Sequence, residues 1–257
     1  MSEKNTSIHE FDFNLICEYF SKLKRQGPGS KEVTLKALSF IENINKNSLI
    51  ADIGCGTGGQ TMTIAQNTKA TVLGIDLSPI FIDIFNKNIK KQNLAKRVKG
   101  EIASMDKLNF ENESLDLIWA EGSIYNIGFK KGLKEWHKFL KQGGYIAISE
   151  ASWFTEERPE EIEGFWKDAY PEIDTISKKI SQMQKSGYVP MASFILPESC
   201  WIDNFYKPQL SIQEKFLKKY PDNEAVKSFI ESERHEAKLY EKYKDFYGYV
   251  FYIGKKI

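Results

Sequence analysis

Glycines at alternate positions follow an apolar run and an aspartate in the first quarter of the chain. The segment reads Leu49-Ile50-Ala51-Asp52-Ile53-Gly54-Cys55-Gly56-Thr57-Gly58-Gly59-Gln60. Glycine suits a backbone that takes positive φ or approaches a ligand closely, and a helix that follows offers unpaired N–H groups in its first turn. The pattern therefore predicts a strand, a tight turn and a helix, with the turn forming a nucleotide-binding loop.

The carboxylate of Asp52 limits what this loop can bind. Gly54, Gly56 and Gly59 fit the dinucleotide pattern G-x-G-x-x-G, which would place a pyrophosphate at the helix N-terminus. Asp52 would repel that pyrophosphate, and Gly58 is a glycine that the pattern does not require. A cationic ligand fits the loop better, and a dinucleotide-dependent oxidoreductase is the weaker alternative.

A second carboxylate follows the next β-branched run, residues 70–75. Ser78 and Pro79 are suited to cap and begin a helix, so Asp76 should lie at the carboxyl end of a strand, where open α/β sheets bind ligands. Its two oxygens can accept hydrogen bonds from both hydroxyls of a ribose. Asp76, with Leu77 beside it, therefore indicates a ribose-bearing ligand.

In the order Asp52-x-Gly54-x-Gly56-x-Gly58, the sequence resembles the class I S-adenosylmethionine-dependent methyltransferases, small-molecule type, over about residues 30–196. The resemblance implies S-adenosyl-L-methionine as the cofactor, whose ammonium and sulfonium suit the acidic loop. It also implies that the protein is an enzyme. A methyl group would pass to a small acceptor by in-line displacement, in a pocket that excludes water.

The same resemblance assigns residues to the cofactor site. The match is partial at Ser104, which replaces the carboxylate that usually binds adenine, so Ser104 or Asp106 would bind the adenine amino group beside Met105. The full set of cofactor-binding candidates is Arg25, Gly27, Asp52, Gly54, Cys55, Gly56, Gly58, Gln60, Asp76, Leu77, Ser104, Met105, Asp106 and Glu121.

Candidate catalytic residues follow two expected strands, over residues 114–120 and 145–150. They are Glu121, Tyr125 and Trp153. Glu121 would hold the methionine end of the cofactor or act as a base, Tyr125 would line the acceptor pocket, and Trp153 would lie over the substrate. Each has a structural alternative, because Glu121 or Tyr125 could cap a turn and Trp153 could pack in the core.

Strand and helix patterns alternate through the middle of the chain and predict an α/β fold. We expect a Rossmann-like, seven-stranded mixed sheet with helices on both faces, N-terminal helices and a helical insertion before the last strand. One helix should end at Gly143-Gly144, just before a strand over residues 145–150. We predict one methyltransferase domain, 1–257, divided into an N-terminal helical lid (1–45), a cofactor-binding core (46–196), a helical insertion (197–245) and the last strand (246–257).

Composition and charge indicate which kinds of partner the protein does not bind. The 36 Lys and Arg residues balance 35 Asp and Glu residues, so no basic field favours a nucleic-acid substrate. Neither a signal segment nor a membrane-spanning apolar run is visible, which predicts a cytoplasmic protein without a membrane partner. Cys17, Cys55 and Cys200 have no metal-ligand spacing, so we expect free thiols and no metal.

Tyr, Trp and Phe are frequent in the N-terminal helices and the insertion, which we expect to close over the acceptor as a lid. Such a lid predicts a mostly apolar or aromatic acceptor. The insertion could instead form a homodimer interface. Because no residue is assigned as a nucleophile, a non-catalytic S-adenosylmethionine-binding or scaffold protein is the alternative function.

Overall fold

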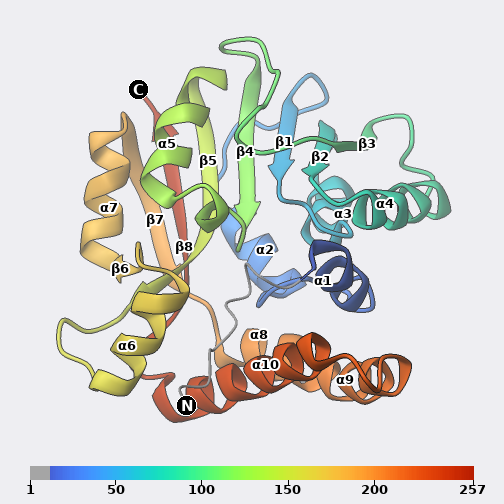
Figure 1. Ribbon diagram of the computed structural model, residues 1–257. Coiled ribbons are helices and arrows are strands. Elements are labelled where there is room, and N and C mark those ends of the chain that lie inside the picture. The colour runs from blue at the N-terminus through green and yellow to red at the C-terminus, as the bar shows by residue number, and fades with distance from the viewer. Residues whose placement is uncertain (1–11) are drawn as a thin grey trace.

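The apolar runs of the sequence assemble into one mixed sheet in the computed structural model, which describes residues 12–257 (Figure 1). The strand order is β3-β2-β1-β4-β5-β8-β7, and a short eighth strand, β6, pairs with β5. Strands β1 to β5 run parallel, whereas β8 is antiparallel to both of its neighbours. The strands are β1 (Leu49–Ile53), β2 (Thr71–Asp76), β3 (Val98–Ile102), β4 (Leu115–Glu121), β5 (Leu140–Trp153), β6 (Asp174–Thr175), β7 (Tyr188–Ile195) and β8 (Tyr247–Lys256).

Helices cover both faces of the sheet, which confirms the expected fold class. Residues of α2, α3 and α4 pack in one core cluster, and residues of α5 and α7 pack in the cluster on the other face. The helices are α1 (Phe13–Phe20), α2 (Lys31–Leu38), α3 (Gly59–Asn67), α4 (Pro79–Lys91), α5 (Phe129–Trp136), α6 (Glu160–Ala169), α7 (Ile176–Lys185), α8 (Glu198–Trp201), α9 (Lys207–Lys219) and α10 (Glu224–Tyr243). Shorter turns are the 3-10 helices Ile124–Asn126 and His137–Phe139 and the π-helix Ile202–Tyr206.

Serine side chains cap the first turns of two of these helices, and the sequence predicts the cap at Ser78. The hydroxyl of Ser78 accepts a hydrogen bond from the backbone N–H of Phe81, and Pro79 is the first residue of α4. In the same way the hydroxyl of Ser30 accepts from the N–H of Val33 at the start of α2. Both caps bring a helix N-terminus to the carboxyl edge of the sheet.

The expected end of the helix at Gly143-Gly144 is wrong. Helix α5 ends at Trp136, and β5 already begins at Leu140. Gly143 has φ +75° inside that strand, and a Cβ on Gly144 would lie 2.9 Å from a backbone oxygen. The two glycines therefore form an irregularity in the pairing of β5 with β4, a role that glycine often has within strands.

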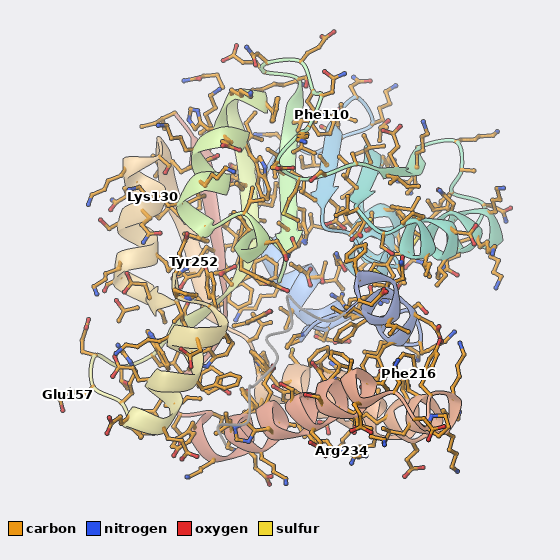
Figure 2. The ribbon with its side chains drawn as sticks, viewed as in Figure 1. Phe110, Lys130, Glu157, Phe216, Arg234 and Tyr252 are labelled. Atoms are coloured by element: carbon orange, nitrogen blue, oxygen red, sulfur yellow. The ribbon has the colours of Figure 1, made fainter. Side chains whose placement is uncertain are left out.

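Helices α8, α9 and α10 form a layer that faces the carboxyl ends of the central strands (Figure 1). Helix α1 joins this layer, because Tyr19 packs against Phe216 and Phe229 with ring centroids 5.4 Å and 5.1 Å apart. The Tyr19 hydroxyl also donates to Gln209 Oε1 at 2.7 Å. Figure 2 labels Phe216 within this layer and Tyr252 in the sheet above it. The N-terminal segment and the insertion thus meet over the edge of the sheet where ligands bind.

Phe85 provides a test of the packing that supports this edge. A Cβ at Gly58 or Gly74 would lie 2.1 Å or 2.4 Å from its ring. We expect Phe85→Ala to lower the free energy of unfolding by about 3–5 kcal/mol, because it leaves a cavity beneath the loop. Urea denaturation measures the change. The control is Ile80→Ala on the same helix, 39% exposed, with an expected loss under about 1 kcal/mol; equal losses would contradict this role of the ring.

Candidate functional site

The glycine loop has the predicted strand, turn and helix geometry. Gly54, Gly56 and Gly58 have φ values of +78°, +54° and +87°, which side chains with a Cβ rarely adopt. The N–H groups of Gly54 and Cys55 donate to the carbonyl of Ile75 at 2.8 Å and 2.9 Å, so the loop is anchored to β2. Cys55 itself is a buried free thiol beneath the loop.

Asp52 lies under the loop and is fully buried. Its carboxylate accepts a hydrogen bond from the Thr61 hydroxyl at 2.5 Å and a longer one, 3.5 Å, from Gln60 Nε2. Burial raises the pKa of Asp52 to about 7, and the negative charge of Glu121 adds to that rise. Asp52 therefore ties β1 to the first turn of α3 and places a titratable group behind the loop.

Asp76 connects the loop to the start of α4. Its Oδ2 accepts from the N–H of Gly56 and its Oδ1 from the N–H of Ser78, both at 2.9 Å. Each oxygen keeps a further lone pair that can accept from a ribose hydroxyl. Leu77 and Ile102, 54% and 56% exposed, present apolar surface beside it. This arrangement suits a nucleoside, with the ribose on Asp76 and the base on apolar side chains.

Ser104, Met105 and Asp106 follow β3 at the same edge. The Ser104 hydroxyl donates to the carboxylate of Asp106, and this hydrogen bond lowers the pKa of Asp106. The carbonyl of Met105 accepts from Trp136 Nε1 at 3.1 Å, while its methyl group lies near Gly54. Ser104 and Asp106 thus form one polar pair, so the structure joins the two candidates for the adenine amino group.

Glu121 is held by the N-terminal segment. Its carboxylate forms an ion pair with Arg25 at 2.6 Å and accepts from the Thr34 hydroxyl at 2.7 Å and from Trp119 Nε1 at 3.0 Å. Its side chain is 4% exposed. Three donors leave this carboxylate little capacity to act as a base, so the arrangement favours a positioning role for Glu121 and Arg25 together.

Gln26 is a neighbour of the loop that sequence analysis missed. Its Oε1 accepts from the N–H of Thr57 at 2.8 Å, and its Nε2 donates to the Thr57 hydroxyl at 3.1 Å. A Cβ on Gly56 would lie 2.1 Å from this Oε1. Gly27, in contrast, has open space around its Cα. A single glutamine next to a loop carries no pattern that distinguishes it from a surface residue.

The two aromatic candidates lie in different surroundings. Tyr125 is 44% exposed, with its ring 6.0 Å from that of Tyr170. Trp153 is buried at the end of β5, and the guanidinium of Arg158 lies 4.3 Å from its ring centroid. The position of Trp153 matches the core-packing alternative, whereas Tyr125 is free to line an acceptor site. Contact of either residue with a substrate stays a prediction.

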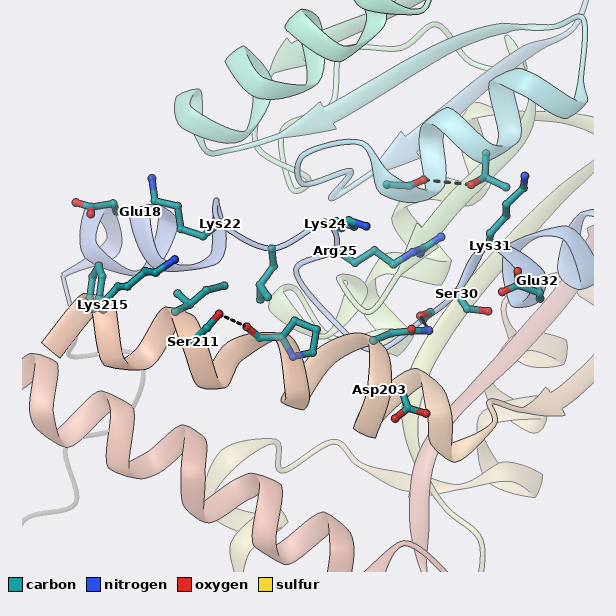
Figure 3. A pocket seen from close by; sticks show the side chains of 18 of the residues that line it. Glu18, Lys22, Lys24, Arg25, Ser30, Lys31, Glu32, Asp203, Ser211 and Lys215 are labelled. Atoms are coloured by element: carbon teal, nitrogen blue, oxygen red, sulfur yellow. Dashed lines mark hydrogen bonds between the residues drawn. The ribbon is translucent and has the colours of Figure 1, made fainter. Parts of the chain in front are cut away.

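A cavity of 870 Å³ lies between the segment 22–32 and α9 (Figure 3). It shares Arg25 and Gly29 with the surroundings of Glu121, but Asp76 and Tyr125 are not among its lining residues. It therefore lies beside the candidate site and not over the strand ends.

Within residues 12–257, no group of three or more His, Cys, Asp or Glu side chains could hold a metal ion. No helix in the same range is long and apolar enough to cross a membrane.

The raised pKa of Asp52 predicts a pH dependence of stability. Between about pH 4 and pH 7 the folded protein keeps a proton on Asp52 that the unfolded chain releases. Stability from this group therefore falls as the pH rises, by about 1.4 kcal/mol per pH unit. We expect Asp52→Asn to flatten the curve of unfolding free energy against pH in this window, measured by denaturant titration. Asp83→Asn, an exposed control, should leave the slope unchanged; equal slopes in all three proteins would contradict the prediction.

Comparisons with known proteins fit this geometry. A family model described as "Methyltransferase domain" matches residues 50–144. A ubiquinone/menaquinone biosynthesis C-methyltransferase from Geobacter sp. (strain M21) is 33% identical over 112 residues, which cover 42% of this chain and 48% of that protein. A sterol 24-C-methyltransferase from Clavispora lusitaniae is 29% identical over 160 residues, 59% of this chain and 41% of that protein. The chain thus matches less than half the length of these curated relatives.

Solved structures show the same fold at low identity. A methyltransferase from Geobacter sulfurreducens, in complex with S-adenosyl-L-homocysteine, has a TM-score of 0.82 at 16% identity, covering 96% of this chain and 99% of that one. A geranyl diphosphate C-methyltransferase from Streptomyces coelicolor A3(2) has a TM-score of 0.61 at 18% identity, covering 87% and 78%.

Proposed function

We propose that this chain is a class I S-adenosylmethionine-dependent methyltransferase, which transfers a methyl group from S-adenosyl-L-methionine to a small acceptor. The proposal depends on one observation, the glycine loop that is hydrogen-bonded to Asp76. This arrangement suits a nucleoside ligand that carries no phosphate group. The curated relatives with a similar sequence are named as C-methyltransferases, which supports the reaction class.

The residues present fit this cofactor. At Gly54, Gly56 and Gly58 the backbone carries no Cβ, so a ligand can approach the loop closely. Asp76 has acceptor capacity for ribose hydroxyls, and Leu77 offers apolar surface for the base. Asp52 behind the loop and Glu121 beside it are carboxyl groups whose ionised forms a cationic methionine end would favour.

The chain would contribute mainly by positioning and by excluding water. When bound, S-adenosyl-L-methionine supplies a methyl carbon attached to a cationic sulfur. The ion pair between Arg25 and Glu121 fixes the loop 24–30 against the end of β4, next to the glycine loop. Holding the acceptor in line and in a dry site can account for most of the acceleration of such a displacement.

The N-terminal helices and the insertion would complete the site as a lid. Asn204 Nδ2 donates to the carbonyl of Gly29 at 2.9 Å, which connects the insertion to the segment above the glycine loop. The nearly balanced charge supports a small-molecule acceptor over a nucleic acid. Three buried free thiols suit a reducing compartment, so we place the protein in the cytoplasm.

The ribose contact gives the most direct test. We expect Asp76→Asn to weaken binding of S-adenosyl-L-methionine and S-adenosyl-L-homocysteine by about 1.5–3 kcal/mol, the scale of hydrogen bonds to a charged group. Isothermal titration calorimetry measures the affinities, and NAD should not bind to either protein. Asp116→Asn, a change at the amino end of β4, is the control. Tighter binding of NAD, or equal affinity in Asp76→Asn with an intact fold, would contradict the proposal. Product formation with an acceptor panel then separates an enzyme from a non-catalytic binding protein.

The lid gives a second test. We expect hydrogen exchange in residues 12–30 and 200–243 to slow when S-adenosyl-L-homocysteine and an acceptor are bound, because closure protects backbone amides. Mass spectrometry of peptides measures the rates, and residues 41–48, before the amino end of β1, serve as the internal control. Equal exchange in the free and bound protein would contradict a lid and would favour a homodimer interface for the insertion.

A further inference from the structure

Two buried glutamates and a half-buried one lie where the insertion faces the sheet. Glu150 lies near the carboxyl end of β5 and is 1% exposed. Glu233 is buried on α10, and Glu236 is half-buried one turn later on the same helix. Helix α10 belongs to the layer that faces the strand ends (Figure 1). Two different parts of the chain therefore bring carboxylates to the side of the molecule where the acceptor would bind.

Among the described residues, these carboxylates have few positive partners. Neither oxygen of Glu150 has a hydrogen-bond partner in residues 12–257, and the Nζ of its ion-pair partner, Lys179, lies 3.9 Å away. Lys179 instead donates to the Tyr170 hydroxyl at 3.0 Å. Within residues 12–257, no Lys, Arg or His nitrogen lies within 4.0 Å of Glu233 or Glu236. Buried negative charge without a partner is costly, so a cation bound here would be stabilised strongly.

Burial raises the pKa values of all three glutamates. It raises the pKa of Glu150 to about 7 and raises the pKa values of Glu233 and Glu236 as well. The charge of Glu236 raises the pKa of Glu233 further, because the two carboxylates interact. A ligand cation would offset both effects by favouring the ionised carboxylates.

Tyr125 relates the carboxylates to the end of β4, because it lies in the short helix that follows this strand. Its side chain is 44% exposed, yet burial raises its pKa to about 12, and the charges of Glu150, Glu236 and Glu233 contribute to that rise. The sequence predicts that Tyr125 lines the acceptor pocket, and its interaction with the three charges relates them to that predicted pocket.

A series of aromatic contacts connects Glu236 to the end of β4. Trp201 stacks on Tyr240 with ring centroids 4.5 Å apart and meets Tyr249 edge-on at 4.8 Å. The Tyr249 ring in turn lies against Gly122, directly after β4. The hydroxyl of Tyr206 donates to Glu236 at 2.9 Å. Aromatic faces beside carboxylates are typical of sites that bind ammonium groups.

We propose that the acceptor carries a positive charge, as a protonated or quaternary amine, which binds among Glu150, Glu233 and Glu236. Its apolar or aromatic body packs on the rings of Tyr125 and Tyr249. This inference rests on the proposed function for the identity of the ligand as the acceptor. The sequence predicts a mostly apolar or aromatic acceptor, and this proposal adds a charged group to it. The proposed lid of the protein contributes two carboxylates as well as aromatic rings.

Binding of a matched pair of probes tests the charge. The full-length protein, saturated with S-adenosyl-L-homocysteine, is titrated calorimetrically with 2-phenylethylamine, which is protonated at neutral pH, and with the neutral 2-phenylethanol. We expect the amine to bind at least about tenfold more tightly, the effect of about 1.4 kcal/mol of charge recognition. Equal affinity, tighter binding of the alcohol, or no binding of the amine at millimolar concentration overturns the proposal.

Variants connect that preference to the glutamates. We expect Glu236→Gln and Glu150→Gln each to reduce the amine affinity about tenfold while the affinity for 2-phenylethanol stays unchanged. Glu231→Gln, an exposed change on the same helix, is the control and should keep the wild-type preference. Glu236→Gln decides the test if Glu150→Gln fails to fold. A preference that survives in Glu236→Gln overturns the proposal.

The same titrations separate this inference from the proposed function. Omitting S-adenosyl-L-homocysteine shows whether the amine binds without the cofactor product. Failure of S-adenosyl-L-homocysteine to bind would refute the methyltransferase proposal, while a retained preference for the amine would still support the cation site. Binding of S-adenosyl-L-homocysteine with no preference for the amine would refute the cation site alone.

Discussion

The ring of Phe85 is the constraint on which the candidate site depends. It fills the space that Cβ atoms would need at Gly58, Gly74 and Gly100, in the loop, β2 and β3. Helix α4 can therefore pack directly on the sheet, and its N-terminus reaches the edge where Asp76 connects it to the loop. The ring therefore requires a glycine at each of these three positions, and only Gly58 among them belongs to the glycine loop.

Sequence patterns predicted the parts of the site that depend on neighbouring residues. Alternate glycines, the capping Ser78 and the strand-end Asp76 each specify a local backbone conformation, and the structure has all three. The pairing of Arg25 with Glu121 joins residues 96 positions apart, and the contact of Gln26 with Thr57 is also non-local. Neither has a periodicity or a motif that a sequence could display, so tertiary packing alone determines them.

The error at Gly143-Gly144 has a related cause. Two glycines after an amphipathic helix are typical of a helix end, and the local pattern could not distinguish that role from an irregular strand. The choice depends on β4, because the pairing of Leu115 with Leu140 extends the strand back past the glycines. The partner strand that decides it lies elsewhere in the sequence.

The burial of the carboxylates of the insertion could have been predicted from their helical spacing, although our sequence analysis considered only the aromatic residues there. On α10, Val226, Phe229 and Ile230 mark the buried stripe, and Glu233, Glu236 and Tyr240 continue it at helical spacing. Charged residues on a helix are usually read as its solvated face, yet a glutamate on the apolar stripe must be enclosed when the helix packs. Buried carboxylates need a partner. Where the described chain offers too few cations, a ligand that brings one is the simplest way to complete the site.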